Sequence, residues 1–245
     1  MLPIIDIRVQ ALKERIRKIK KIVVVCSSKG GVGKSTAAYI LSCILSKSKK
    51  IALCDFDFTG PSLHLLLDTN KTFTEENGIK LPEVSQNLFF LSIVFFTHDK
   101  PLALRGNNIS NIILELFTIA DFENIEILII DTPPTTSDLI LDILKYLENA
   151  DFWVVSSNSL LSYHSVNNFV EVISQRTRNL ELLILNKIFP DDPESFKIFE
   201  KLKSKFRRII SLPYINNIHG YYGKIKEVRS LDFIEQIEKD IVDFM

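Results

Sequence analysis

The sequence contains little cysteine and no excess of charge of either sign. Its three cysteines, Cys26, Cys43 and Cys54, lie in separate apolar stretches, with no C-x-x-C pair and no spacing typical of a zinc site. We therefore expect buried, reduced thiols, which fit a reducing cytoplasm. Thirty lysine and arginine residues balance thirty aspartate and glutamate residues. This balance argues against a globally basic nucleic-acid binder and leaves only local patches for such a partner.

Long apolar runs are missing as well. No apolar run approaches the roughly 18 residues that a membrane span needs, and the N-terminus lacks the apolar core of a signal peptide. The sequence shows no internal repeat and no low-complexity linker. At 245 residues the chain fits one α/β domain that can bury a full core. We therefore expect a cytoplasmic protein.

A strand, a glycine-rich loop and a helix follow one another near the N-terminus. Residues 22–26 are apolar and β-branched, as in a buried parallel strand, and residues 37–45 have the apolar period of a helix. The loop between them can curl around an anion, because Gly30, Gly31 and Gly33 allow successive N–H groups to point at one phosphate. The helix adds its own N-terminal N–H groups. This order predicts a phosphate-binding loop.

The side chains of the loop agree with that prediction. Lys34 is placed to reach the β- and γ-phosphates, and the hydroxyl of Ser35 is placed to coordinate Mg²⁺. The strict pattern would have glycine at position 28, where this chain has Ser28. The loop reads Lys29-Gly30-Gly31-Val32-Gly33-Lys34-Ser35-Thr36, which resembles the deviant Walker A loop of the MinD/ParA/Mrp group of P-loop ATPases. A second, signature lysine marks that group, and here it corresponds to Lys29.

Two aspartates follow the next predicted strand. Residues 50–54 read as a strand, and Asp55 and Asp57 come at its carboxyl end, where ligands bind in open α/β sheets. Asp57 could orient or deprotonate an attacking water, and Asp55 could hold a metal-bound water. Residues 55–67 also resemble the switch I segment of Mrp-type ATPases, D-x-D-x-x-G-P-S-x-P, with His64 where that branch usually has proline.

A third acidic position ends another strand. Residues 125–130 are Ile-Glu-Ile-Leu-Ile-Ile, and Asp131 follows them in the Walker B arrangement, in which a carboxylate holds the hydration shell of Mg²⁺. Residues 131–138 resemble the switch II segment of the family, with Thr135 in place of a glycine that lies close to the γ-phosphate. A β-branched residue resists positive φ and adds bulk, so we expect binding to survive and hydrolysis to suffer.

The resemblance also implies contacts with the base. Asn186 comes at the end of a strand predicted over 180–185, and in this superfamily an asparagine there recognises the adenine edge. Pro213 follows a strand predicted over 208–212, and the family has a proline close to the base at that point. The segment around Arg105 partly matches the W-R-G-P of the Mrp branch. For Arg105 we favour a structural ion pair over a catalytic role.

The alternation of strands and helices predicts a doubly wound α/β fold, with a mostly parallel sheet of about seven strands and helices on both faces. This is the fold of a P-loop NTPase. We expect a basic N-terminal helix within residues 1–21, docked beside the first strand, and an ATPase domain over residues 22–245. Right-handed crossovers would bring the loop and the aspartate segments to one edge of the sheet. The patterns further predict strands at 88–96 and 152–156, and helices at 109–119, 139–147, 160–176, 192–206 and 231–244.

The resemblance implies an ATPase that works as a nucleotide-gated dimer. ATP and Mg²⁺ would bind at residues 29–36, with Asp131 behind the metal. The catalytic residues would be Lys29, which reaches the partner subunit's phosphates, Lys34, and Asp57, which places the water. ATP would join two subunits face to face, and hydrolysis would release them.

Three functions are compatible with these residues. Many Mrp-branch proteins carry an iron–sulfur cluster on a C-x-x-C motif in the C-terminal third. This chain has no cysteine after Cys54, so we expect no bound cluster, while a role in cluster assembly with an unknown client stays open. A ParA/MinD-like positioning ATPase is the second function, in which the basic N-terminal helix and residues 201–208 would contact DNA or a membrane. The third is a non-hydrolysing ATP-binding adaptor, prompted by Thr135.

Overall fold

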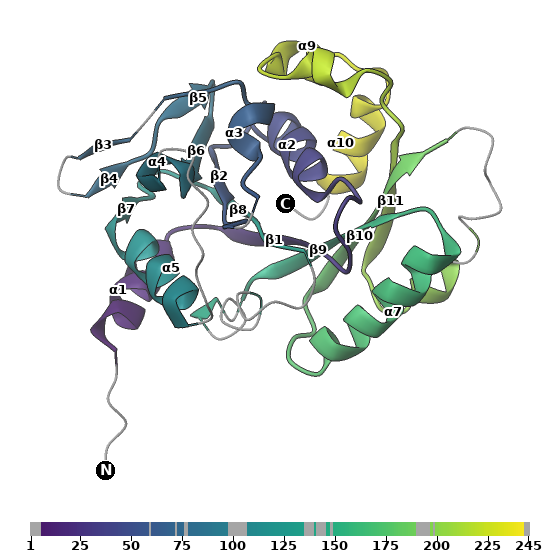
Figure 1. Cartoon of the computed structure of the whole chain (residues 1–245), viewed down its shortest axis with the longest axis horizontal. Coiled ribbons are helices and arrows are strands. Elements are labelled where there is room, and N and C mark those ends of the chain that lie inside the picture. The colour runs from purple at the N-terminus through teal and green to yellow at the C-terminus, as the bar shows by residue number, and fades with distance from the viewer. Residues whose placement is uncertain are drawn as a thin grey trace.

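The chain is built around one large, mostly parallel sheet (Figure 1). The computed structural model describes residues 6–58, 60–71, 73–75, 78–97, 107–134, 140, 146–147, 149–189, 197 and 199–242. The strands of the sheet are β1 (Lys21–Ser27), β2 (Ile51–Asp55), β5 (Glu83–Ser85), β6 (Leu88–Ser92), β8 (Ile127–Asp131), β9 (Asp151–Ser157), β10 (Leu180–Ile188) and β11 (Arg208–Pro213). Their order is β11-β10-β9-β1-β8-β2-β6-β5, and each neighbouring pair is parallel except β5 with β6.

Seven parallel strands confirm the mostly parallel sheet that the sequence predicts. The antiparallel edge strand β5 was not predicted, because three residues are too few to show a period. The apolar run at 88–96 is also not one strand. β6 ends at Ser92, whose Oγ accepts a hydrogen bond from the N–H of Val94 at 3.3 Å, and the short helix α4 (Val94–Thr97) follows.

Alternating side chains of the strands create two separate cores, one on each face of the sheet. Val23 and Val25 of β1 belong to one core, and Val24 and Cys26 belong to the other. The first core is covered by α2 (Lys34–Leu45), α3 (Leu63–Leu66), α9 (Ile225–Arg229) and α10 (Ile234–Val242). The second is covered by α1 (Ile7–Ile16), α5 (Asn107–Ile119) and α7 (Leu160–Ser174). Figure 1 shows these two groups on opposite sides of the sheet.

The N-terminal helix is shorter than expected. α1 begins after Asp6, whose carboxylate accepts a hydrogen bond from the N–H of Arg8 at 3.0 Å, and it ends at Ile16. It packs against α5, and its Leu12 is fully buried. Because the apolar stripe of this helix enters the same core as α5, its basic face is left to the surface.

The remaining elements are short. Three two-residue strands form a second sheet in the order β3 (Thr74–Glu75), β4 (Ile79–Lys80) and β7 (Ala120–Asp121), in which β3 and β4 are antiparallel. Two 3₁₀ turns are η1 (Glu200–Leu202) and η2 (Ile218–Tyr221). The helix predicted at 139–147 falls largely outside the described residues. Of the helix predicted at 192–206, the structure describes residues 197 and 199–206, which contain the 3₁₀ turn η1 and not a continuous α-helix. Within the described part of the chain, no helix combines the length and the apolar character needed to cross a bilayer.

The sheet order brings the predicted motifs to one edge. β8 lies between β1 and β2, with Val25 and Asp55 both in register with Asp131. The strands are parallel, so their carboxyl ends and the loops that follow them share that edge. The loop after β1, the aspartates after β2 and the aspartate that ends β8 are therefore neighbours in space.

Candidate nucleotide-binding site

The loop between β1 and α2, residues 28–36, is called the phosphate loop below. It turns through two residues with left-handed backbone, Gly31 at φ 77° and Gly33 at φ 84°. Gly33 is also the residue that caps the N-terminus of α2. A side chain at Gly33 would be strained, and its Cβ would lie 2.2 Å from Nδ2 of Asn186. Both glycines are therefore needed for the curl that the sequence predicts.

Three predicted side chains meet directly below the phosphate loop. Nζ of Lys34 donates a hydrogen bond to Oδ1 of Asp131 at 2.6 Å, and Oγ of Ser35 donates to Oδ2 of the same carboxylate at 2.6 Å. Asp131 is fully buried, and burial raises the pKa of its carboxyl group, while the Lys34 ammonium acts in the opposite direction. Hydroxyl and carboxylate oxygens side by side are ligands that Mg²⁺ prefers.

Asp55 organises the segment that follows β2. Its Oδ2 accepts hydrogen bonds from the N–H groups of Ser62 and Leu63, both at 2.9 Å, and its Oδ1 accepts one from Asp57 at 3.2 Å. The residue is fully buried. Burial, and then the negative charge of Asp131, raise the pKa of Asp55 to about 7. Its predicted role toward a metal-bound water stays a prediction, while its role in shaping residues 55–63 is direct.

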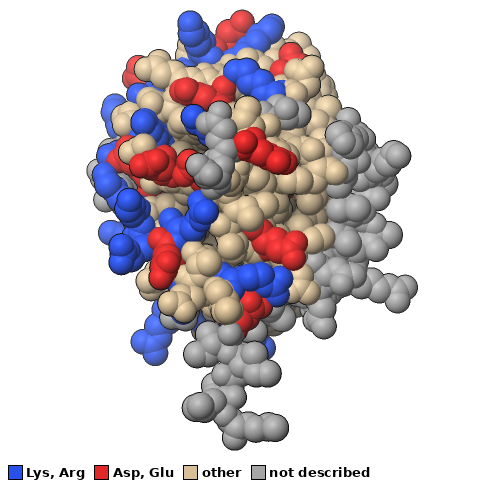
Figure 2. All heavy atoms as spheres, turned by 90° about the vertical axis from the view of Figure 1, so that its left-hand side faces the viewer, with Lys and Arg blue, Asp and Glu red and all other residues tan. Residues whose placement is uncertain are grey.

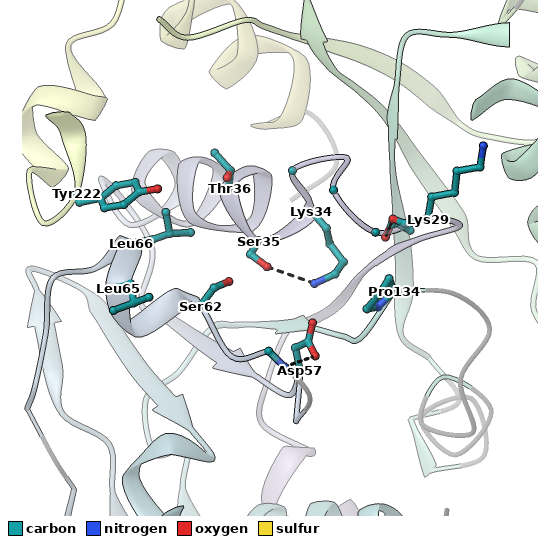
Figure 3. Close-up of a pocket in the computed structure, with 15 residues that line it drawn as sticks. Lys29, Lys34, Ser35, Thr36, Asp57, Ser62, Leu65, Leu66, Pro134 and Tyr222 are labelled. Atoms are coloured by element: carbon teal, nitrogen blue, oxygen red, sulfur yellow. Dashed lines mark hydrogen bonds between the residues drawn. The ribbon is translucent and has the colours of Figure 1, made fainter. Parts of the chain in front are cut away.

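Asp57 lies at the wall of a cavity of about 360 Å³. Figure 3 shows its carboxylate across the cavity from the phosphate loop, with Lys34 between them. Oδ1 of Asp57 accepts a hydrogen bond from the N–H of Gly60 at 3.1 Å, which fixes the turn that carries it. The remaining wall includes Ser35, Thr36 and residues that sequence analysis did not single out, namely Ser27, Leu65, Leu66 and Tyr222. A carboxylate facing a cavity lined by N–H groups fits a water-orienting role.

Lys29 lines the same cavity, but its ammonium group points away from it. Its side chain extends away from Lys34 and Asp57 in Figure 3, and Nζ donates a hydrogen bond to the carbonyl of Leu161 at 3.0 Å. Leu161 belongs to the first turn of α7, which follows β9. The ammonium group therefore sits at the rim of the edge where the strands end.

A second cavity of about 230 Å³ adjoins the first at Thr36. It brings together Asn186 and Pro213, the two residues expected near the base. Next to them, Phe189 and Tyr214 stack with ring centroids 4.7 Å apart and an interplanar angle of 20°. A partly apolar cavity with amide groups is suited to a purine ring.

The strand end at β10 also contacts the phosphate loop, which the sequence did not reveal. Nδ2 of Asn186 donates to the carbonyl of Val32 at 2.8 Å, and Nζ of Lys187 donates to the carbonyl of Gly31 at 2.9 Å.

Two other predicted positions, Arg105 and Thr135, lie outside the described residues. Among the described residues, no group of three or more His, Cys, Asp or Glu side chains could hold a metal ion. The Ser35–Asp131 pair is suited to Mg²⁺ that also binds phosphate oxygens.

The curled glycine loop, the Lys34–Asp131–Ser35 cluster and the sheet order define a P-loop NTPase. The family model described as "ParA: NUBPL iron-transfer P-loop NTPase" matches residues 18–215. The chain belongs to this family, within the MinD/ParA superfamily, and the predicted resemblance to Mrp-type ATPases is confirmed.

Individual proteins agree with this assignment. The iron-sulfur cluster carrier protein of Rickettsia conorii is 35% identical to this chain, over 56% of this chain and 44% of that protein. The iron-sulfur cluster carrier protein of Rickettsia prowazekii is 32% identical, over 75% of this chain and 57% of that protein. The chain thus spans about half the length of these curated relatives. A nucleotide-binding protein from Archaeoglobus fulgidus, solved in complex with ADP, matches with a TM-score of 0.70 and 22% identity, covering 91% of this chain and 93% of that chain. That likeness supports the fold.

Proposed function

We propose that this chain binds ATP with Mg²⁺ in the two adjoining cavities and hydrolyses ATP as a nucleotide-gated dimer, in the service of iron–sulfur cluster assembly. The observation that carries the proposal is the cluster below the phosphate loop, where Lys34 and Ser35 both contact Asp131 at 2.6 Å. These are the groups that meet phosphate oxygens and Mg²⁺ in P-loop NTPases. The joined cavities offer room for phosphates at one end and a base at the other.

Each group has a defined task in this proposal. The N–H groups of the phosphate loop and the N-terminus of α2 bind the phosphates, and Lys34 neutralises charge that develops on them. Ser35 and Asp131 would hold Mg²⁺, either directly or through its water ligands, and the ion would supply positive charge that neutralises the phosphates. Asp57 faces the same cavity and orients the attacking water. Asn186 and Pro213 border the base.

The dimer is supported by the surface of the carboxyl edge. Lys29 places its ammonium group at that rim and away from its own cavity, as a lysine that serves a partner's phosphates would. Several large apolar side chains are exposed in the segments that follow β2, β9, β10 and β11, namely Leu65, Leu160, Leu161, Phe189 and Tyr214. Apolar residues gathered on one edge favour contact with a second subunit.

The proposed link to iron–sulfur clusters rests on the names of the relatives. We propose that this chain's own cysteines hold no cluster. Cys26, Cys43 and Cys54 are each fully buried, on β1, α2 and β2. Burial disfavours the thiolate that an iron–sulfur cluster needs as a ligand. The chain would then act as the ATPase of an assembly reaction whose cluster ligands come from a client.

The basic segments give less support to a DNA- or membrane-positioning role. In the 201–208 cluster, Lys203, Arg207 and Arg208 lie 2.5, 3.4 and 3.9 Å from carboxylate oxygens of Glu200, Glu181 and Asp240. Figure 2 shows the face that contains α1 and the small sheet, and there basic and acidic side chains are interspersed. An interspersed surface offers a polyanion less than a patch of one sign would.

Light scattering with nucleotides tests the proposal. We expect a monomer without nucleotide or with ADP, a dimer with ATP and Mg²⁺, and a longer-lived dimer for Asp57→Ala, because hydrolysis would no longer release it. Asp232→Asn, on an exposed carboxylate of the C-terminal segment, is the matched control. Absence of ATP binding would refute the proposal. ATP binding without turnover would favour the adaptor, and salt-sensitive, ATP-dependent binding to DNA or liposomes would favour the positioning role.

A further inference from the structure

The carbonyl side of the phosphate loop is held by two consecutive residues of β10. When a loop turns its N–H groups inward to an anion, its carbonyl groups point outward and need partners of their own. Nδ2 of Asn186 lies 2.8 Å from the carbonyl oxygen of Val32 and 3.4 Å from that of Gly33, and Nζ of Lys187 lies 2.9 Å from that of Gly31. Three successive carbonyls of the loop thus meet one strand end.

The backbone at this strand end is shaped for these contacts. Lys187 has a left-handed backbone with φ 61°, which is unusual for a residue with a side chain. Pairing of β10 with β11 is irregular between Leu185 and Ile188, and the sheet register resumes with Ile188 opposite Pro213. The distortion therefore coincides with the two residues that contact the loop.

Packing leaves Asn186 little freedom. The residue is 5% exposed, and its Nδ2 lies so close to Gly33 that an added Cβ there would be 2.2 Å away. Carbonyl oxygens only accept hydrogen bonds, so the side of the amide that faces the loop must be its NH₂ group. The donor group of Asn186 is thereby committed to the loop, and only its Oδ1 is left for a base.

We propose that Asn186 and Lys187 are positioning residues for the phosphate loop, acting on the loop's carbonyl groups and not only on the base. The Lys187 ammonium also polarises the peptide group between Gly31 and Val32, which strengthens the N–H of Val32 as a donor. The inference rests on the proposed nucleotide binding. It predicts that both residues matter for a ligand that has phosphates and no base.

Calorimetric titration with MgATP and with magnesium tripolyphosphate tests this inference. Lys187→Met should lower the affinity for both ligands by a similar factor of about five or more, because a charged hydrogen bond to the loop is lost. Lys187→Arg keeps a cationic donor and should bind both ligands more tightly than Lys187→Met. Asn186→Asp turns a donor into an acceptor facing the carbonyl of Val32. It should lower the affinity for both ligands by about tenfold or more.

A second lysine provides the matched control. Nζ of Lys71 also donates to a backbone carbonyl, that of Glu83 at 2.7 Å, away from both cavities. Lys71→Met should leave both affinities unchanged, and the melting temperature of each ligand-free variant reports folding separately. Unchanged tripolyphosphate affinity in Lys187→Met and Asn186→Asp, with the wild type binding it, would overturn the inference. A wild type that binds neither ligand would instead refute the proposed function.

Discussion

The ammonium group of Lys34 lies 2.6 Å from Oδ1 of Asp131, and the two side chains are only 7% and 0% exposed. The cation of the phosphate loop is therefore neutralised by the carboxylate proposed to stand behind the metal. A buried charge without a partner is strongly unfavourable, so loss of either member would leave the other uncompensated. When MgATP binds, phosphate oxygens would replace Asp131 as the partner of Lys34, and the hydrated cation would replace Lys34 as the partner of Asp131.

Removal of one partner should therefore destabilise the ligand-free protein. We expect Lys34→Met to lower the free energy of unfolding by about 3 kcal/mol or more, because Asp131 is left buried and uncompensated. The double variant Lys34→Met/Asp131→Asn should recover part of that loss, because it carries no unpaired charge. Denaturant unfolding of the wild type, both single variants and the double variant measures the coupling.

An exposed pair provides the comparison. Nζ of Lys20 lies 2.8 Å from Glu126, and the lysine side chain is 68% exposed. Lys20→Met should change the free energy of unfolding by no more than about 1 kcal/mol, because water screens the pair. Equal losses for Lys34→Met and Lys20→Met would contradict the interpretation of the Lys34–Asp131 pair.

Asp57 should separate turnover from binding. Asp57→Asn keeps the shape of the side chain and its acceptor for the N–H of Gly60, and it removes the charge that would orient or deprotonate water. We expect single-turnover ATP hydrolysis to fall by about 10²-fold or more, with the dissociation constant for ATP nearly unchanged. A variant that hydrolyses ATP at the wild-type rate would exclude Asp57 as the water-orienting residue.

Lys29 should matter for dimerisation more than for ATP binding by the monomer. Its Nζ donates a hydrogen bond to the carbonyl of Leu161 at the rim, so Lys29→Ala leaves the contacts of Lys34 and Ser35 with Asp131 in place. We expect Lys29→Ala to stay monomeric with ATP at concentrations at which the wild type dimerises, while ATP still binds. Sedimentation velocity with ATP measures this, and unchanged dimerisation together with unchanged turnover would show that Lys29 does not act across subunits.

The parallel strands were predictable because each carries its own signal. Buried parallel strands are short, continuous apolar runs, and those at β1, β2 and β8 are each bounded by charged or glycine-rich segments. The end of β6 was not predictable, because the apolar run continues through Phe95 and Phe96 after the chain has turned into α4. β5 and the small sheet are two to three residues per strand and have no readable period.

The site was predictable where a motif fixes the backbone and not where a fold brings distant residues together. Lys34, Ser35 and Asp131 meet as expected, because the phosphate loop and the end of β8 are adjacent in any sheet of this order. The contact of Lys187 with Gly31 depends on the left-handed backbone of Lys187 itself. A lysine in the sequence does not indicate such a conformation. Tyr222 reaches the first cavity from the segment after η2, far from any motif.

The cysteines offer a test of the proposal that this chain holds no cluster on its own thiols. Burial raises the pKa of Cys43 to about 12 and raises the pKa of Cys26 and Cys54 as well, so the reactive thiolate is suppressed near neutral pH. We expect an alkylating reagent to label none of the three in the folded protein, and all three after addition of denaturant, as measured by mass spectrometry.

A control for this labelling is a cysteine placed on the surface. Ser174 is exposed at the end of α7, so Ser174→Cys should be labelled rapidly in the folded protein. Reconstitution with iron and sulfide should then leave the wild type without cluster absorbance, because none of its thiols can reach the metal without unfolding. Rapid labelling of a native cysteine, or a stable cluster on the isolated chain, would show that a thiol becomes accessible in the folded state and would refute this part of the proposal.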